Sequence, residues 1–274
     1  MNKLILSDLD FTLLRSDTTL SEFTKDIWNR ASQKEKLSIA TARSYTGVKE
    51  LLKGLELKEP LILLDGVIIA KPNGDILNIA AIDKSLGNEV LNIAKKELNL
   101  EPLIVALNGK EEQFLYPKNP NKYQQTMLET MKNRKRFFAN SNLKAADINL
   151  KIVFQANEED SIALENALKS ILKENIEIKR SKDPYFHCYF ITVLNPLGDK
   201  AHALAKLEEI ENVDINNTTV FGDSHNDIGM FELAGIKIAV GNAIEELKQR
   251  ADIILPHTND EDAVAKYLQE KLKL

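Results

Sequence analysis

Two aspartates stand one residue apart at the end of a short apolar run near the start of the chain. The run Leu4–Leu6 is of strand-forming type, and after Ser7 come Asp8, Asp10 and Thr12. Because side chains alternate along a strand, Asp8 and Asp10 are expected to lean to the same side, with Thr12 close by. Two carboxylates held this close repel each other unless a cation lies between them or one takes a proton. The segment therefore indicates either a cation site or a strand that ends in a solvated acidic turn.

A cation at this pair would suit the chemistry of phosphate esters. Mg²⁺ is a hard ion that prefers oxygen ligands and usually keeps a substrate phosphate in its shell. A carboxylate can also attack phosphorus and form an aspartyl-phosphate. The segment alone therefore raises the hypothesis of metal-assisted phosphoryl transfer.

Three further segments carry polar residues just after a predicted strand or a loop. Thr41 and Arg43 follow an apolar run, Lys200 comes shortly after a loop, and residues 222–227 read Gly-Asp-Ser-His-Asn-Asp. In an open parallel α/β sheet, ligands bind at the carboxyl ends of the strands. These segments, although distant in sequence, are therefore expected to converge on one pocket.

The order of predicted elements indicates an α/β fold that carries an inserted domain. Short apolar runs alternate with amphipathic stretches in residues 1–82 and 191–274, which is typical of a parallel sheet flanked by helices. Residues 83–190 instead predict helices interspersed with hairpin-like strands. We therefore expect a core domain of residues 1–82 and 191–274, and an α+β domain of residues 83–190.

Two helices are predicted from a cap residue or from the extent of the pattern. Ser44 can cap a helix whose apolar stripe is Val48, Leu51, Leu52 and Leu55. A second helix is predicted over residues 122–134, where it would end in a basic tract, residues 132–136, on a solvated face.

Composition limits the partners of this protein. The 274 residues carry a formal net charge of −5, which argues against nucleic acid as the main partner. No apolar stretch approaches the roughly 18 residues that a membrane span needs. The single cysteine, Cys188, excludes an internal disulfide and a zinc cluster built on cysteines. We expect a cytoplasmic protein, a monomer or weak homodimer, that binds neither membranes nor nucleic acid.

The motifs, taken together, resemble those of haloacid-dehalogenase superfamily phosphatases of the Cof-type branch. The family's first motif, Asp-x-Asp-x-Thr, stands at residues 8–12, and its fourth, Gly-Asp-Ser-x-Asn-Asp, stands at residues 222–227. Its second-motif threonine and arginine match Thr41 and Arg43, and its lysine matches Lys200. The resemblance covers essentially the whole chain. It implies a Rossmann-like core and a large α+β cap inserted between the second and third motifs.

The resemblance implies catalytic roles for four residues. Asp8 would attack phosphorus and carry the aspartyl-phosphate. Asp10 would protonate the leaving alcohol and then take a proton from the hydrolytic water. Thr41 would donate its hydroxyl to a phosphoryl oxygen, and Lys200 would pair with both the Asp8 carboxylate and the phosphoryl group.

The resemblance also implies a Mg²⁺ site and a set of substrate contacts. The ion would be bound by the Asp8 carboxylate, the Asp10 carbonyl and the Asp223 carboxylate, with Asp227 as a further candidate ligand. Cof-type relatives often have Asn-Gly where this chain has Asp65-Gly66, so an acceptor-only carboxylate replaces an amide there. The candidates for substrate binding are Thr12, Arg43, Asp65, Gly66, Asn226 and Asn242.

The function implied is that of a Mg²⁺-dependent phosphatase acting on a small phosphorylated metabolite. Sugar phosphates are the leading substrate class, followed by phosphorylated cofactors and nucleotides. A phosphomutase or phosphotransferase would use the same intermediate, and a non-catalytic binding protein could keep the same fold. The cap is expected to set specificity, with Tyr116, Lys118 and Tyr185 as candidates to face the substrate.

Overall fold

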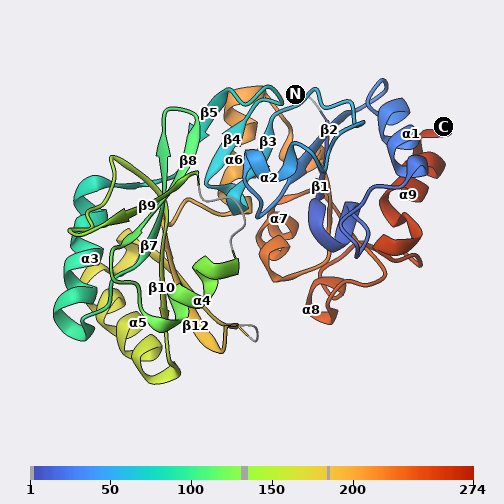
Figure 1. Cartoon of the computed structure of the whole chain (residues 1–274). Helices are drawn as coiled ribbons and strands as arrows, with labels where there is room; N and C mark the ends of the chain where they lie inside the picture. Colours follow the sequence, from blue (N-terminus) through green and yellow to red (C-terminus); the bar gives the residue numbers. More distant parts are fainter. Residues whose placement is uncertain (1–2, 131–134, 184–185) are drawn as a thin grey trace. The chain divides into compact units, whose positions relative to one another are not determined.

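The computed structural model describes residues 3–130, 135–183 and 186–274, which form two compact units (Figure 1). The core unit consists of the chain up to Ile79 together with Leu197–Leu274, and the inserted unit is Ala80–Pro196. Tyr185 and the last four residues of the helix predicted over 122–134 lie outside the described residues. Among the described residues, no helix is long and apolar enough to cross a membrane.

The core unit is built on an eight-stranded sheet in the order β15-β14-β13-β1-β2-β3-β4-β5. The central strand β1 (Leu4–Asp8) pairs in parallel with β2 (Lys36–Ala40) on one side and β13 (Thr219–Gly222) on the other. The expected parallel α/β sheet is thus confirmed. The remaining strands are β3 (Leu61–Leu63), β4 (Ile68–Ala70), β5 (Ile76–Ile79), β14 (Ile236–Ala239) and β15 (Ile253–Ile254).

Six α-helices flank this sheet in the part of the core unit that the structure describes. Ser21 caps α1 by accepting a hydrogen bond from the backbone N–H of Thr24, a role typical of serine, and the helix buries Ile27 and Trp28. The helices are α1 (Glu22–Ala31), α2 (Tyr45–Val48), α6 (Lys200–Glu211), α7 (Ile228–Leu233), α8 (Glu245–Lys248) and α9 (Ala263–Leu272).

The long helix predicted after Ser44 is wrong. Ser44 does accept a hydrogen bond from Gly47 N–H, but α2 ends at Val48 and the chain continues in turns as far as Gly54. Gly47 weakens the helix, and Gly54 has a φ of +98°, a left-handed conformation in which a helix cannot continue. Val48 and Leu52 are still buried, because side chains on a turn can pack against the core as those on a helix do.

The inserted unit holds a second sheet in the order β11-β12-β10-β7-β8-β9, and β6 also pairs with β10. Helices α3 (Lys84–Leu98) and α5 (Glu158–Leu172) lie side by side on one face (Figure 1) and bury an apolar cluster that includes Phe154. The other elements are β6 (Ile82–Asp83), β7 (Leu103–Asn108), β8 (Glu111–Pro117), α4 (Lys122–Thr130), β9 (Phe137–Asn140), β10 (Ile148–Ala156), β11 (Glu177–Asp183) and β12 (Cys188–Leu194).

Strand β9 is an element that the sequence pattern did not predict. It has only four residues and pairs in parallel with β8, so that Phe137 stacks on Phe114 with ring centroids 4.4 Å apart. A strand this short next to a basic tract carries too little alternation to be recognised, and a tertiary contact decides its conformation.

Candidate active site

Three neighbouring strands of the core sheet end beside one another and present the predicted motifs. Asp8 is the last residue of β1 and lies in register with Ala40 at the end of β2, so Thr41 follows directly. On the other side of β1, β13 ends at Gly222, and Asp223 follows. The carboxyl ends of parallel strands thus bring the first, second and fourth motifs to one edge of the sheet.

Asp10 is placed by a turn and not by strand alternation, so the expectation that it shares a strand face with Asp8 is wrong. Strand β1 ends at Asp8, and Leu9–Leu13 form a single helical turn interrupted at Asp10 and Phe11. The Asp10 carboxylate lies against Arg43, which donates from Nε to Oδ2 over 2.8 Å and from Nη2 to Oδ1 over 2.5 Å.

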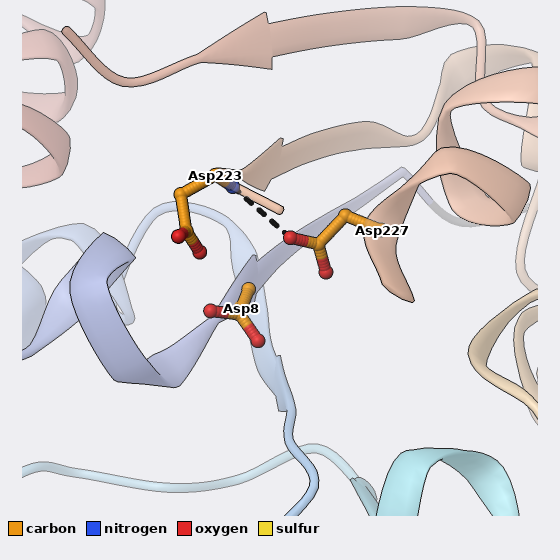
Figure 2. Close-up of side chains that lie close together, drawn as sticks. All are labelled: Asp8, Asp223 and Asp227. Atoms are coloured by element: carbon orange, nitrogen blue, oxygen red, sulfur yellow. Dashed lines mark hydrogen bonds between the residues drawn. The ribbon is translucent and has the colours of Figure 1, made fainter. Parts of the chain in front are cut away.

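Asp8, Asp223 and Asp227 form a carboxylate cluster within the described part of the chain. One oxygen from each lies within 4.8 Å of the others, and Figure 2 shows Asp8 at the end of its strand with the other two on the segment after β13. Hard oxygen donors of this kind are the ligands that Mg²⁺ prefers. The three carboxylates therefore fit a divalent cation by donor type and spacing.

Lys200 brings a positive charge to this cluster. Its Nζ donates to Asp8 Oδ1 over 2.5 Å and to Asp227 Oδ1 over 2.7 Å, and the residue is only 1% exposed. Burial lowers the pKa of Lys200, but the charges and hydrogen bonds of the two carboxylates outweigh it, so the net pKa is raised. Lys200 therefore stays charged.

One lysine does not neutralise three carboxylates. Burial, together with the charges of Asp227 and Asp223, raises the pKa of Asp8 to about 8 against the attraction of Lys200. Burial and the charge of Asp227 raise the pKa of Asp223 to about 6. With every group ionised, two negative charges remain, and a divalent cation would balance them.

Asp227 differs from its two neighbours because protein donors hold both of its oxygens. Oδ2 accepts from the backbone N–H groups of Asp223 at 3.0 Å and Ser224 at 3.1 Å, the first of these drawn in Figure 2, while Oδ1 accepts from Lys200. Gly222 leaves room for this arrangement, since a Cβ there would lie 2.7 Å from the Asp227 side chain. Asp227 thus orients the loop and Lys200.

Gly66 has a similar spatial role at the start of α6. Its φ is +113°, and a Cβ at this position would overlap the backbone carbonyl of Asp199, the residue that caps α6 just before Lys200. The absence of a side chain lets the turn Leu64–Gly66 approach the first residue of that helix. A residue predicted to bind substrate therefore has a packing role that bears on Lys200.

Thr12 and Thr41, buried with 1% and 0% exposure, make contacts within the site. The Thr12 hydroxyl donates to Asp223 Oδ1 over 3.0 Å and so orients a carboxylate of the cluster. Thr41 Oγ1 accepts from the backbone N–H of Arg43 over 3.1 Å. The Thr12 hydroxyl thus lies in the turn after β1, and the Thr41 hydroxyl lies directly after the end of β2.

The remaining predicted substrate contacts pair with one another or with the backbone. Asn226 Nδ2 donates to Asp65 Oδ1 over 3.0 Å, which links the fourth motif to the segment after β3. Asn242 donates to the carbonyl of Phe11 and accepts from the N–H of Asn259, each over 2.8 Å. Asn242 therefore fixes the turn that carries Asp10 and Thr12.

Sequence reasoning missed Asn259, which lies just before α9. Its side chain, 3% exposed, donates to the carbonyl of Leu14 over 3.0 Å and so anchors the end of the turn that follows β1. No spacing rule distinguishes this asparagine from others near the surface. Only the fold reveals that a residue 245 positions away holds the first motif in place.

A family model supplies the decisive comparison. The model of haloacid dehalogenase-like hydrolases matches residues 5–268. The chain belongs to this family. The prediction of a haloacid-dehalogenase superfamily phosphatase is confirmed by this match and by curated relatives that are named as phosphatases.

Relatives and a solved structure match this haloacid dehalogenase-like hydrolase over nearly its whole length. The 5-amino-6-(5-phospho-D-ribitylamino)uracil phosphatase YitU of Bacillus subtilis is 27% identical over 99% of this chain and 98% of its own. A second B. subtilis 5-amino-6-(5-phospho-D-ribitylamino)uracil phosphatase, YwtE, is 26% identical over 98% of each chain. A crystal structure from Thermotoga maritima shares the fold, with a TM-score of 0.81 at 24% identity, over 98% of this chain and 97% of that one.

Proposed function

We propose that this enzyme is a Mg²⁺-dependent phosphatase that hydrolyses a small phosphorylated metabolite through an aspartyl-phosphate on Asp8. The observation that carries the proposal is the contact of the buried Asp8 carboxylate with Lys200 inside a cluster of three carboxylates. A carboxylate kept next to a buried ammonium group is available as a nucleophile toward phosphorus. The same ammonium group suits the charge of a transferring phosphoryl group.

The donor set supports a cation at this cluster. The Asp8 and Asp223 carboxylates and the Asp10 carbonyl would hold Mg²⁺, and Asp227 would support them, because its oxygens already accept hydrogen bonds from protein donors. When bound, the ion supplies positive charge that offsets the carboxylates and the phosphate. Burial and the charge of Asp227 raise the pKa values of Asp8 and Asp223, and a cation beside the two carboxylates would favour their ionised forms.

The chain's own groups account for the bond changes. An Asp8 oxygen forms a bond to phosphorus while the bond from phosphorus to the leaving oxygen breaks, and Asp10 gives that oxygen its proton. Water then attacks phosphorus, its proton passes to Asp10, and the bond to Asp8 breaks. Arg43 holds the Asp10 carboxylate in place, and Thr41 and Lys200 donate to the phosphoryl oxygens.

Sugar phosphates and related polyol phosphates are the proposed substrate class. Two relatives that match the chain from end to end are named as phosphatases of a phosphorylated ribitylamino compound, which is a polyol phosphate. The compound that this chain acts on belongs, on this proposal, to the same chemical class.

The test is phosphate release from a panel of sugar phosphates, nucleotides and cofactor phosphates, with Mg²⁺ and with a chelator. Asp8→Asn is measured beside the wild type, because an amide cannot attack phosphorus. Release that needs both Mg²⁺ and Asp8 is the expected result. Equal release by Asp8→Asn, with its fold verified by circular dichroism, would refute the mechanism.

A further inference from the structure

Phe11 has a backbone conformation that is unfavourable for its residue type. It lies between Asp10 and Thr12 with a φ of +59° and a ψ of +10°, in the left-handed region. A bulky L-residue held there is strained, whereas glycine adopts the same conformation freely. A phenylalanine at this position therefore has to be explained by something other than backbone preference.

The conformation of the turn is imposed by contacts on both sides of Phe11. Asn242 holds the Phe11 carbonyl over 2.8 Å, and Asn259 holds the Leu14 carbonyl over 3.0 Å. Leu14 N–H also donates to the carbonyl of Leu9 over 2.8 Å, which closes the turn. These backbone contacts, and not the side chain of residue 11, are the interactions seen to hold the turn in which φ is positive.

The ring of Phe11 does not fill the core. It is 54% exposed, whereas its neighbours Leu9, Leu13 and Leu14 in the same turn are all buried. The exposed part of a large aromatic side chain contributes no burial to folding, and here the exposure accompanies a strained backbone. More than half of the Phe11 surface is therefore not used in packing, and the residue lies in the turn that supplies two residues of the site.

We propose that the Phe11 ring is a specificity-determining contact for the leaving group of the substrate. An aromatic ring offers a flat apolar face on which another ring can stack. Such stacking stabilises a complex beyond the effect of the surface area that both rings bury. The substrate class that follows is a sugar or polyol phosphate whose leaving group also carries a flat ring, such as a pyrimidine or a larger heterocycle. This inference rests on the phosphatase function proposed above.

Two pairs of esters isolate the contribution of the ring. Uridine 5′-monophosphate and ribose 5-phosphate share a primary phosphate ester and differ by a pyrimidine, and flavin mononucleotide differs from ribitol phosphate by the flavin. We expect the wild type to hydrolyse the ring-bearing member of at least one pair with a kcat/KM about fivefold higher or more. Phe11→Ala should lower that kcat/KM about tenfold, mainly through KM, and change the ring-free partner by less than about threefold.

Two further variants separate the ring from the backbone. Phe11→Tyr keeps an aromatic face and should keep the preference of the wild type. Thr18→Ala is the matched control, because Thr18 is also exposed and has a φ of +66°, so it places alanine in the same left-handed conformation away from the ring. Thr18→Ala should leave every kcat/KM within about twofold of the wild type.

The outcomes distinguish this inference from the phosphatase proposal. Equal losses for ring-bearing and ring-free esters in Phe11→Ala, or no loss at all, would overturn the role of the ring while phosphatase activity stands. If the wild type releases no phosphate, the role of the ring is tested by binding instead. Quenching of flavin fluorescence then gives the Kd of flavin mononucleotide for Asp8→Asn, with and without Phe11→Ala. A roughly tenfold weaker Kd in the double variant supports the contact, and an unchanged Kd refutes it.

Discussion

Lys200 and Asp8 are 192 positions apart in the chain, yet Lys200 Nζ lies 2.5 Å from Asp8 Oδ1 and both groups are buried. One comes from the first turn of α6 and the other from the last residue of β1. Removing one partner of such a pair leaves a buried charge without compensation. The contact therefore links the stability of the core unit to its proposed chemistry.

Replacement of Lys200 should affect both catalysis and stability, unlike replacement of a lysine on the surface. We expect Lys200→Ala to reduce kcat by several powers of ten, through lost stabilisation of the transferring phosphoryl group. The variant should also melt at a lower temperature, because Asp8 and Asp227 lose their shared partner. Steady-state phosphate release and thermal melting measure the two quantities.

Lys206→Ala is the control, since Lys206 lies on the same helix in an exposed pair with Glu209. Such a pair contributes at most about 1 kcal/mol, so kcat should be unchanged and the melting temperature nearly so. A loss of less than about threefold in Lys200→Ala would remove Lys200 from the site.

The stability of the metal-free protein should fall as the pH rises from about 4 to about 8. Burial raises the folded-state pKa of Asp8 from 3.8 to about 8, and that of Asp223 from 3.8 to about 6. In this window the folded state binds more protons than the unfolded chain, so unfolding is favoured as protons become scarce. Melting temperatures measured in a chelator across this range test the sign.

Added Mg²⁺ should reverse that trend. The cation binds ionised carboxylates, so the rise in melting temperature that it causes should be small near about pH 5 and largest above about pH 8. Asp223→Asn, which removes one proposed ligand, should show little rise at either pH. An equally large rise at both pH values in the wild type would contradict a site built on these carboxylates.

Gly66→Ala should lower both the stability of the protein and its kcat. The added methyl group would overlap the backbone of Asp199, so the start of α6 has to shift. The alanine would also have to adopt a φ of +113°. We expect a loss of at least about 2 kcal/mol in the free energy of unfolding, because backbone cannot move aside as a flexible side chain can. Chemical denaturation gives this value, and kcat should fall because Lys200 moves with α6.

Gly109→Ala provides the comparison. Gly109 has a φ of +61°, and nothing lies within 4 Å of the position of its added Cβ, so only backbone strain remains. Its cost should be about 1–2 kcal/mol with kcat unchanged. Similar values for the two variants would show that the approach of Gly66 to Asp199 does not matter.

Arg43→Lys should lower kcat although the charge is conserved. The Arg43 guanidinium contacts both oxygens of Asp10, and its own pKa is raised, chiefly by this hydrogen bonding. Lysine is a point charge that cannot reproduce the planar two-oxygen contact, so Asp10 would lose its fixed orientation. We expect a fall of about tenfold or more in kcat, measured by phosphate release.

Arg30→Lys serves as the matched change at an exposed pair, since Arg30 contacts Asp26 one helical turn away on α1. It should leave kcat unaltered. If Arg43→Lys behaves in the same way, the ion pair with Asp10 has no part in orienting the proposed acid and base.

Much of the local structure follows from the sequence because local rules act on a few neighbouring residues. The N-caps Ser21, Asp83 and Asn157 each accept a hydrogen bond from a backbone N–H three residues on, as their residue types predict. The parallel sheet follows from the alternation of apolar runs and amphipathic stretches. The family follows from motifs whose order and residue types are sufficient for recognition.

Where long-range contacts compete with these rules, local pattern fails. Helix α2 stops at Val48 although the apolar stripe continues, because Gly47 and Gly54 oppose a longer helix, and Leu52 is buried from a turn instead. Strand β9 forms because Phe137 can stack on Phe114, a contact that no four-residue pattern predicts. Asp10 leaves the strand because distant asparagines hold the turn around it.

The sequence by itself determined which residues can do chemistry and the order in which they occur. The tertiary structure alone decided how they are coupled: Lys200 between Asp8 and Asp227, Arg43 on Asp10, and Phe11 held at a positive φ. The physical reason is that burial and pairing depend on what the folded chain brings within a few ångströms. Residue type fixes what a group can donate or accept, whereas its neighbours in space fix its charge, its orientation and its exposure.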